Sequence, residues 1–358
     1  LSSQNAMILN RTYISALAAC EMNEDSVSLW NRNATHEDFM SYRIGIGDID
    51  FQEEISIPKE RFSLVDDDLA DRPRQIRDQF RTLKNVPVLL DVRKERLVGI
   101  IGKKSRVEAV GMARSIIAQI VTANCYTDVK IALVYDENDD VDREAWDFMK
   151  WFPHVWSEDR KIRFIATNQD EMGDVFFAMS QIFRHRIEEN SFSDRGILKP
   201  QYILIVSNPK LVEESIISTY VFDRNQNIGL STIFLADMYR NLPNDCECII
   251  NCANNTISYT KSSKERGIPV ELDQVSNERV LALAKRLGNI RVSESGEEGE
   301  IPTMLTFFDM YDVGVPEELR AAERWRHADP TATLKAMIGY KTGNRPCYLD
   351  LNEKYHGP

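Results

Sequence analysis

Short, nearly continuous apolar runs divide most of this chain into a regular alternation of predicted strands and helices. Runs without interleaved polar positions are typical of strands that are covered on both faces of a parallel sheet. Such strands are expected at Val88–Val92, Leu97–Ile101, Val129–Tyr135, Ile162–Ala166, Tyr202–Val206, Ser231–Leu235 and Cys248–Ile250. Apolar residues at helical spacing predict helices at Arg106–Asn124 and Val175–Glu189. The pattern therefore predicts an α/β fold, a mostly parallel sheet flanked by helices and joined by right-handed crossovers.

The segments on either side of this alternation are less regular. At the start we expect an amphipathic helix at Ile8–Met22, a short strand at Arg43–Gly47 and a charged helix at Asp71–Lys84. Near the end, Ser293–Glu300 contains no apolar residue, which predicts a linker or an exposed loop. We therefore expect an N-terminal lead-in (residues 1–60), an α/β domain (residues 61–295), and a linker with the truncated start of a following domain (residues 296–358).

The last residues predict that the chain is a piece of a longer protein. The apolar stretch Cys347–Leu349 indicates a strand, and the polar run that follows ends in His356, Gly357 and Pro358, which are typical of a turn. The tail is too short to form a large core alone, so we expect it to pack on the preceding domain or on further sequence.

Composition is ordinary for a globular protein and narrows the range of partners. The chain has 358 residues, of which 43% are apolar, and its net charge is −12. An acidic chain is repelled by nucleic acid, so no nucleic-acid partner is expected. No apolar run approaches the roughly 18 residues of a membrane-spanning helix.

Six cysteines are spread along the chain, which suits a reducing compartment such as the cytoplasm. The closest set, Cys246, Cys248 and Cys252, lacks the CxxC pairs and the fourth ligand of a usual zinc site. We interpret these residues as reduced thiols on or beside a strand, and we expect no metal.

One predicted turn between a strand and a helix lies where a phosphate-binding loop belongs. Its candidate residues are Gly99, Gly102, Lys103, Lys104 and Ser105. A working loop has the pattern GxxxxGK[ST], in which backbone amides cradle phosphate, the lysine reaches the terminal phosphates and the hydroxyl holds magnesium. With Lys104 and Ser105 as the functional pair, Lys103 stands where the second glycine is required. With Gly102 and Lys103 as the functional pair, Lys104 stands where the serine or threonine hydroxyl is required. We therefore interpret the loop as vestigial and expect no bound cofactor, while weak nucleotide binding stays open as the alternative.

The acidic half of a nucleotide site is also missing from its expected place. Ser207 and Asn208 follow the strand Tyr202–Val206, where a catalytic aspartate and glutamate would stand. Neither side chain acts as a general base at neutral pH. Asp136 and Glu137 follow an earlier strand, too soon for the usual strand order, and are interpreted as solvated acids.

Two other segments carry candidate chemistry. The run from Trp146 to Trp156 is rich in aromatic residues and predicts a packing cluster or a domain contact. His154 lies within it but has no visible nucleophile or acid partner. Arg184, His185 and Arg186 could bind phosphate, but a solvated helical face is the simpler interpretation. No GxSxG elbow is present.

The order of several segments resembles the EssC/EccC ATPases of type VII secretion systems, members of the FtsK/SpoIIIE superfamily. The resemblance is to the region between the transmembrane segments and the first motor domain. It rests on the segments Arg43–Gly47, Asn85–Pro87, Val98–Gly102, Tyr126–Ile131, Trp146–Trp156 and Leu349–Pro358.

This resemblance implies a RecA/P-loop-NTPase-like domain without a functional P-loop. In the parent, three further ATPase domains that use ATP and Mg would follow, and Met304–Pro358 would be the leading strands of the first of them. The parent would be anchored in the plasma membrane with this region on the cytoplasmic side, form rings, and export small WXG-motif proteins. Its partners would be the adjacent ATPase domains, other subunits of the secretion machinery and the secreted proteins. No position here matches the family's catalytic residues.

Three functions are compatible with these features. The favoured one is a catalytically silent, ATPase-like module that couples the membrane anchor to the ATPase domains. A divergent P-loop NTPase with weak ATP binding is the first alternative. A substrate-docking module that uses the aromatic segment is the second.

Overall fold

The computed structural model describes residues 2–50, 72, 75–76, 82–190, 197–223, 227–260, 267–292, 305–311, 313–328, 331, 335–341 and 345–350. The chain divides into two compact units, Leu1–Ile290 and Arg291–Pro358. The division falls close to the predicted linker at residues 293–300.

The first unit is an α/β structure. Its strands are β1 (Ser41–Asp50), β2 (Thr82–Asp91), β3 (Leu97–Ile101), β4 (Val129–Val134), β5 (Ile165–Ala166), β6 (Gln201–Val206), β7 (Leu230–Ala236), β8 (Cys248–Asn251), β9 (Thr256–Tyr259) and β10 (Ile268–Leu272). Its α-helices are α1 (Ser2–Thr12), α2 (Ala16–Cys20), α4 (Val107–Ala123), α5 (Gln169–Asn190), α6 (Lys210–Glu213), α7 (Ser218–Phe222) and α8 (Asn277–Leu287). Short 3₁₀ helices are η1 (Met149–Trp151), η2 (Pro153–Val155) and η3 (Tyr239–Asn241).

These strands form one sheet in the order β2-β1-β10-β9-β8-β3-β7-β6-β4-β5. Neighbours from β8 to β5 are parallel, whereas β9, β10, β1 and β2 continue the sheet with antiparallel pairs. The lead-in of residues 1–60 thus contributes β1 to the same sheet as the α/β region. Within the parallel part, the chain passes from β3 across to β4 and returns through β6 and β7 to β8 on the other side of β3. Ligands of such sheets bind beyond the carboxyl ends of the strands, where the connections diverge.

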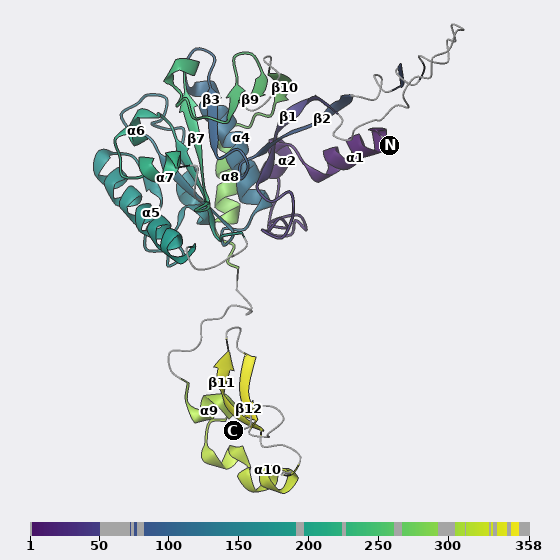
Figure 1. The fold of residues 1–358 in the computed structure, drawn as a ribbon, viewed down its shortest axis with the longest axis vertical. Coiled ribbons are helices and arrows are strands. Elements are labelled where there is room, and N and C mark those ends of the chain that lie inside the picture. The colour runs from purple at the N-terminus through teal and green to yellow at the C-terminus, as the bar shows by residue number, and fades with distance from the viewer. Residues whose placement is uncertain are drawn as a thin grey trace, which may run out of the picture. The chain divides into compact units, whose positions relative to one another are not determined.

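Alternate residues of the central strands enter two hydrophobic cores, one on each face of the sheet. In β3, Val98 and Ile100 belong to the core that α4 and α8 cover, and Leu97 and Ile101 to the core that α5, α6 and α7 cover (Figure 1). Every residue of β3, β4, β6 and β7 is buried. Polar chemistry is therefore confined to the ends of these strands and to the loops that follow them.

An N-terminal strap, residues 13–40, closes the C-terminal end of α4. The last carbonyl groups of a helix have no partner within the helix. Here the backbone N–H of Trp30 donates to the Thr122 carbonyl oxygen at 2.8 Å, and that of Arg32 donates to Ala123 at 3.1 Å. The indole Nε1 of Trp30 donates to the carbonyl oxygen of Val121 at 2.8 Å. The strap therefore stabilises a helix that is remote from it in sequence.

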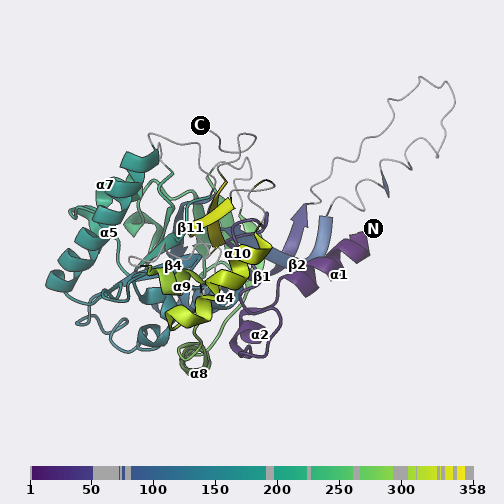
Figure 2. The ribbon, with the colours of Figure 1, turned by 90° about the horizontal axis from the view of Figure 1, so that it is seen from below.

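Helix α1 precedes the strap and lies alongside the outermost strand, β2 (Figure 2). The Asn10 side chain fixes it there, because its Nδ2 donates to the carbonyl oxygen of Asn85 at 3.1 Å.

The predicted fold class is confirmed, and so are most of the central elements. Five predicted strands and one helix agree with β3, β4, β6, β7, β8 and α4 to within one residue at each end. The helix predicted at Val175–Glu189 corresponds to α5, which is longer and begins six residues earlier, at Gln169. The strand predicted at Arg43–Gly47 is likewise the central part of β1.

Other predictions were wrong in their bounds or their type. The single helix at Ile8–Met22 is two helices, because Ser15 starts α2 by accepting a hydrogen bond from the Ala18 N–H on its side chain. The end of the helix predicted at Asp71–Lys84 is the beginning of β2. Most of the rest of that segment lies outside the described residues. Only Ile165 and Ala166 of the strand predicted at Ile162–Ala166 pair with β4.

The second unit consists of α9 (Phe307–Tyr311), η4 (Pro316–Leu319), α10 (Ala321–His327) and a hairpin of β11 (Lys335–Lys341) and β12 (Arg345–Asp350). The strand predicted at Cys347–Leu349 is part of β12, and residues 351–358 lie outside the described residues. No side chain of this unit whose burial is described is buried. Within the described parts of both units, no helix is long and apolar enough to cross a bilayer.

The stability of the first unit is predicted to depend on pH through His154. Burial lowers the pKa of His154 to about 3, against about 6.5 in an unfolded chain. Between these values the unfolded chain binds a proton that the folded chain does not bind. The free energy of unfolding should therefore fall as the pH falls through this window, by up to about 1.4 kcal/mol per pH unit.

Urea unfolding of the wild type and of His154→Gln between pH 7 and pH 5 measures this effect. Other titrating groups are common to both proteins, so the stability advantage of the wild type should shrink as the pH falls. An advantage that stays constant over this range would contradict the role given to His154.

Candidate functional site

A hollow of about 710 Å³ lies at the carboxyl ends of β3, β6 and β7. Its walls come from the loop after β3, the segment after β6 and the segment after β7. Its lining includes Lys104, Ser105 and Arg106 from the first, Asn208 and Lys210 from the second, and residues 235–237 and 240–245 from the end of β7 and the segment after it. This is the place where a sheet of this order holds its ligand.

The predicted phosphate loop lies at this edge of the sheet, but its backbone is packed against itself. The Gly102 N–H donates to the Ala236 carbonyl oxygen at 2.9 Å. A Cβ built on Gly102 would lie 1.7 Å from the carbonyl oxygen of Ser105. None of Gly102, Lys103, Lys104 and Ser105 has a positive φ. The loop therefore needs glycine at 102 for space, and it lacks the left-handed residues that turn successive amides toward an anion.

A carboxylate of the protein itself lies at this loop. Glu108, in the first turn of α4, accepts a hydrogen bond from the Lys103 N–H on Oε2 at 3.2 Å. The Ser105 Oγ accepts a hydrogen bond from the Val107 N–H at 3.3 Å. A helix N-terminus favours negative charge, and here an internal carboxylate provides it. Sequence reasoning missed Glu108, although its spacing from Ser105 is that of a capping box.

A second carboxylate, Asp142, is completely buried beside the hollow. Its Oδ2 accepts a hydrogen bond from the Ser207 Oγ at 2.8 Å, and its Oδ1 accepts one from the Trp146 Nε1 at 3.1 Å. Arg106 Nη2 lies 3.3 Å from Asp142 Oδ2 and 2.7 Å from Asp139 Oδ2. Burial raises the pKa of Asp142 above its usual value. The hydrogen bonds from Trp146 and Ser207 and the charge of Arg106 oppose this rise but do not reverse it.

The strand-end positions therefore have structural partners. Ser207, where an acid of a working site would stand, is buried and bound to Asp142. The Asn208 Oδ1 accepts a hydrogen bond from the Lys210 N–H at 3.2 Å. Asp136 and Glu137 follow β4; Asp136 accepts a hydrogen bond from the Asn138 N–H of the same loop, and Glu137 accepts one from the Thr167 hydroxyl of the loop after β5. Neither Asp142 nor Arg106 was predicted as a site residue, because both looked like solvated charges in the sequence.

The cysteine cluster lies at β8. Cys246 and Cys248 are buried, and burial raises the pKa of the Cys248 thiol. Burial likewise raises the pKa of Cys252 to about 12, and its Sγ lies 3.8 Å from the Glu108 carbonyl oxygen. Among the described residues, no group of three or more histidine, cysteine or acidic side chains is placed to hold a metal ion.

The aromatic segment is mostly core. Trp146, Phe148 and Phe152 are buried, which confirms the prediction of a packing cluster. Trp151 is the exception, because 47% of it is exposed and the Lys285 Nζ lies 5.8 Å above its ring.

The interpretation of Arg184, His185 and Arg186 as a solvated helical face is wrong for one of them. Arg186 is buried, and its guanidinium donates to the carbonyl oxygens of Ile228 at 2.8 Å and Pro200 at 2.7 Å. It therefore joins α5 to two loops and is not free to bind phosphate.

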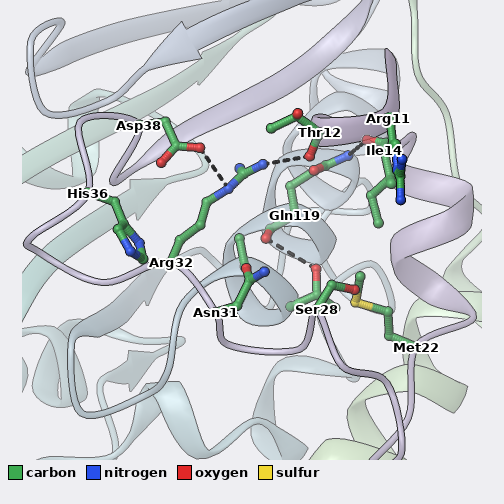
Figure 3. A pocket seen from close by; sticks show the side chains of 12 residues that line it. Arg11, Thr12, Ile14, Met22, Ser28, Asn31, Arg32, His36, Asp38 and Gln119 are labelled. Carbon is green, nitrogen blue, oxygen red and sulfur yellow. Dashed lines mark hydrogen bonds and ion pairs between the residues drawn. The ribbon is translucent and has the colours of Figure 1, made fainter. Parts of the chain in front are cut away.

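A separate pocket of about 500 Å³ lies between the N-terminal strap and α4 (Figure 3). Arg32 is its central charge, 3.1 Å from Asp38, and it donates to the carbonyl oxygen of Thr12 at 2.8 Å. Gln119 of α4 donates to the Ile14 carbonyl oxygen at 2.8 Å (Figure 3). These polar groups form hydrogen bonds and an ion pair with other groups of the protein. The pocket is therefore a packing junction between the strap and α4, and it does not resemble a catalytic site.

The sheet order and the position of the hollow define the fold of a RecA-like ATPase domain. No protein-family model matches the chain. The chain is 27% identical over 336 residues to the ESX secretion system protein EccC of Geobacillus thermodenitrificans, covering 92% of this chain and 22% of that protein. It is 23% identical over 339 residues to the type VII secretion system protein EssC of Staphylococcus aureus, covering 92% of this chain and 22% of that protein.

A solved structure agrees with the fold. The cytoplasmic domain of the Thermomonospora curvata type VII secretion ATPase EccC superposes with a TM-score of 0.50 at 12% identity, covering 95% of this chain and 42% of that one. Over almost its whole length the chain is therefore similar to one region of the EssC and EccC proteins of type VII secretion systems. It spans about a fifth of the length of the curated relatives that it matches.

Replacement of Gly102 by alanine is predicted to destabilise the first unit. The added Cβ cannot lie 1.7 Å from the Ser105 carbonyl oxygen, so the backbone must move. Overpacking of this kind costs about 1–3 kcal/mol. Gly111, in the middle of α4, is the matched control, because a Cβ there meets nothing within 4 Å. Gly111→Ala should stabilise by about 0.5–1 kcal/mol. Chemical denaturation of both variants measures the difference, and equal effects would contradict the close packing of the loop.

Proposed function

We propose that this region is a catalytically silent, ATPase-like module of a membrane-anchored secretion motor. In this role it couples the membrane-side part of the parent to the ATPase domains and supports export of small WXG-motif proteins. The relatives are components of type VII secretion systems. The region would lie on the cytoplasmic side, contact the adjacent ATPase domains and other secretion subunits, and take part in a ring of parent chains. It would need no cofactor, while ATP and Mg would serve the other domains of the parent.

The observation that carries the proposed silence is the carboxylate of Glu108 at the phosphate loop. Its hydrogen bond with the Lys103 N–H holds negative charge at the N-terminal end of α4, where a nucleotide would place a phosphate. The γ-phosphate of ATP would meet that charge at close range, which is unfavourable without a cation between them. Ser207 at the end of β6 supplies no base, and its hydroxyl already donates to Asp142.

The coupling role is supported by direct bonds between the N-terminal segment and α8, the last helix of the first unit. Glu21 and Arg279 form an ion pair at 2.6 Å. Arg286 donates through Nε to the Met22 carbonyl oxygen at 3.2 Å, and through Nη2 to that of Cys20. Because α8 ends just before the division at residues 290 and 291, displacement of the N-terminal segment acts on the helix that leads into the second unit.

A more buried ion pair lies next to these contacts between the N-terminal segment and α8. Asp273 binds Arg43 of β1 at 3.0 Å and accepts a hydrogen bond from the Ala16 N–H, also at 3.0 Å. These contacts fix α2 to β1 and to the chain just before α8. The N-terminal segment, the sheet and α8 therefore form a continuous connection.

Two alternatives have one observation each in their favour. A divergent NTPase is favoured by Lys104 and Ser105, which line the hollow. A docking module that uses the aromatic segment is favoured by the exposed ring of Trp151.

Titration of ATP with Mg into the first unit and the full fragment tests the silence. We expect no heat and no thermal shift at millimolar nucleotide, which means a dissociation constant weaker than about 1 mM, or binding weaker than about −4 kcal/mol. Micromolar binding, or hydrolysis that Lys104→Ala abolishes, would establish the divergent NTPase instead.

Arg286→Ala in the full-length parent tests the coupling. Loss of its two hydrogen bonds should lower stability by only about 1–3 kcal/mol, but export of a WXG-motif protein should fall strongly at equal protein abundance. Arg143→Ala is the control, because Arg143 makes only an exposed ion pair with Asp140. Export at the wild-type level in Arg286→Ala would exclude the proposed connection.

A further inference from the structure

Helix α5 has one face in a hydrophobic core and an opposite face that is open to solvent. On the core side, Met172, Phe176 and Phe183 are buried. On the open side, Phe177 is 59% exposed. The helix lies at the margin of the first unit in both views (Figure 1, Figure 2). A single exposed apolar residue is common on a protein surface, so the residues around Phe177 determine whether this face can bind a partner.

Two oppositely charged residues lie at equal distances from Phe177 along this face. Asp170 precedes Phe177 by seven residues, and Arg184 follows it by seven. Seven residues make nearly two helical turns, so the three side chains lie on one side of α5, about 10 Å apart along its axis. Asp170 and Arg184 are both exposed. Neither forms an ion pair with a residue that the structure describes.

The positions between these residues leave space on the same face. Gly173 and Gln181 lie four residues before and four residues after Phe177, and both are exposed. A Cβ built on Gly173 meets nothing within 4 Å, so the surface is open one turn away from Phe177. Asp174 is also exposed and adds a second acid on this side. Between Asp170 and Arg184, the face is therefore acidic before Phe177 and basic at its far end.

A face with this arrangement is complementary to itself when two copies of the helix pack antiparallel. A two-fold axis at Phe177 places each residue opposite the one that lies equally far beyond Phe177 in the second helix. Asp170 then faces Arg184 of the second copy, and the same contact recurs on the other side of the axis. The two Phe177 rings meet at the axis, and aromatic rings in contact attract each other. A parallel pair would place like charges together instead.

We propose that two copies of this chain pair through α5, antiparallel and about a two-fold axis at Phe177. The charge complementarity of the face with itself selects a second copy as the partner. One pair of helices buries less than the roughly 1,200 Å² of a stable complex, so the dissociation constant should be on the order of 100 µM. Parent chains held in one assembly would meet at a higher effective concentration.

This pairing leaves the contacts of the N-terminal segment accessible. Helix α5 packs on the core of one sheet face, whereas α4 and α8 pack on the core of the other. The connection from the N-terminal segment to α8 is therefore on the opposite side of the sheet from the proposed dimer contact. The pairing does not rest on the proposed catalytic silence.

Sedimentation equilibrium of the full fragment measures the pairing. The wild type should dimerise with a dissociation constant on the order of 100 µM, and the dimer should weaken as the salt concentration rises. Phe177→Ala should weaken it by about tenfold or more. Tyr239→Ala is the matched control and should dimerise like the wild type, because Tyr239 is an aromatic residue, 69% exposed, on η3. An equal loss in both variants, or a wild type that stays monomeric at about 1 mM, would overturn the proposal.

Charge reversal tests the antiparallel orientation. Arg184→Asp and the double variant Asp170→Arg/Asp174→Arg should each be monomeric where the wild type is dimeric, because like charges then face each other. An equimolar mixture of the two should form a dimer, because both contacts again join an aspartate to an arginine. A mixture as monomeric as its components would exclude the two-fold axis at Phe177.

A single chain that carries all the reversals gives an independent measurement. The variant Asp170→Arg/Asp174→Arg/Arg184→Asp exchanges the charges within each contact, so it should dimerise as strongly as the wild type. The substituted side chains are all exposed, and the melting temperature of each variant verifies that it is folded. A folded triple variant that stays monomeric would contradict the pairing of Asp170 with Arg184.

Discussion

The buried carboxylate of Asp142 determines what the carboxyl end of this sheet can do. An ionised carboxylate without solvent must be matched by hydrogen bonds and opposite charge, or its burial is strongly unfavourable. Trp146, Ser207 and Arg106 provide these partners. They come from three different segments, so one carboxylate joins the ends of β3, β4 and β6. The same bonds engage the hydroxyl at the end of β6 and the arginine at the end of the loop after β3.

The parallel core could be predicted from the sequence because burial on both faces requires nearly consecutive apolar residues, a pattern that is easily recognised. Each of β3, β4, β6 and β7 consists mostly of apolar residues, and the apolar stripe of α4 lies between two such strands. The antiparallel part of the sheet shows this pattern only in parts of β1 and β2, which the strands predicted at Arg43–Gly47 and Val88–Val92 overlap. In β10, Glu271 is exposed and only Val270 is buried, so the strand depends on pairing with β1, which lies more than two hundred residues earlier in the chain.

The candidate site was predictable in its place but not in its contents. The glycines and lysines after β3 located the loop, and the interpretation of that loop as vestigial stays a prediction. Asp142 is one of many acids between Asp136 and Asp147, and nothing in the sequence distinguishes the single buried one. Arg186 was misjudged for the same reason, because its partners are carbonyl groups that any sequence offers. Long-range polar contacts of single side chains carry no periodic signal.

The proposed catalytic silence and the packing beside the hollow depend on the same two carboxylates. Glu108 binds an amide of the loop after β3, and Asp142 binds the hydroxyl at the end of β6, so groups of the protein itself hold both places in one arrangement. Under the proposed function, a site held in this way would serve a motor as a rigid link between its moving parts.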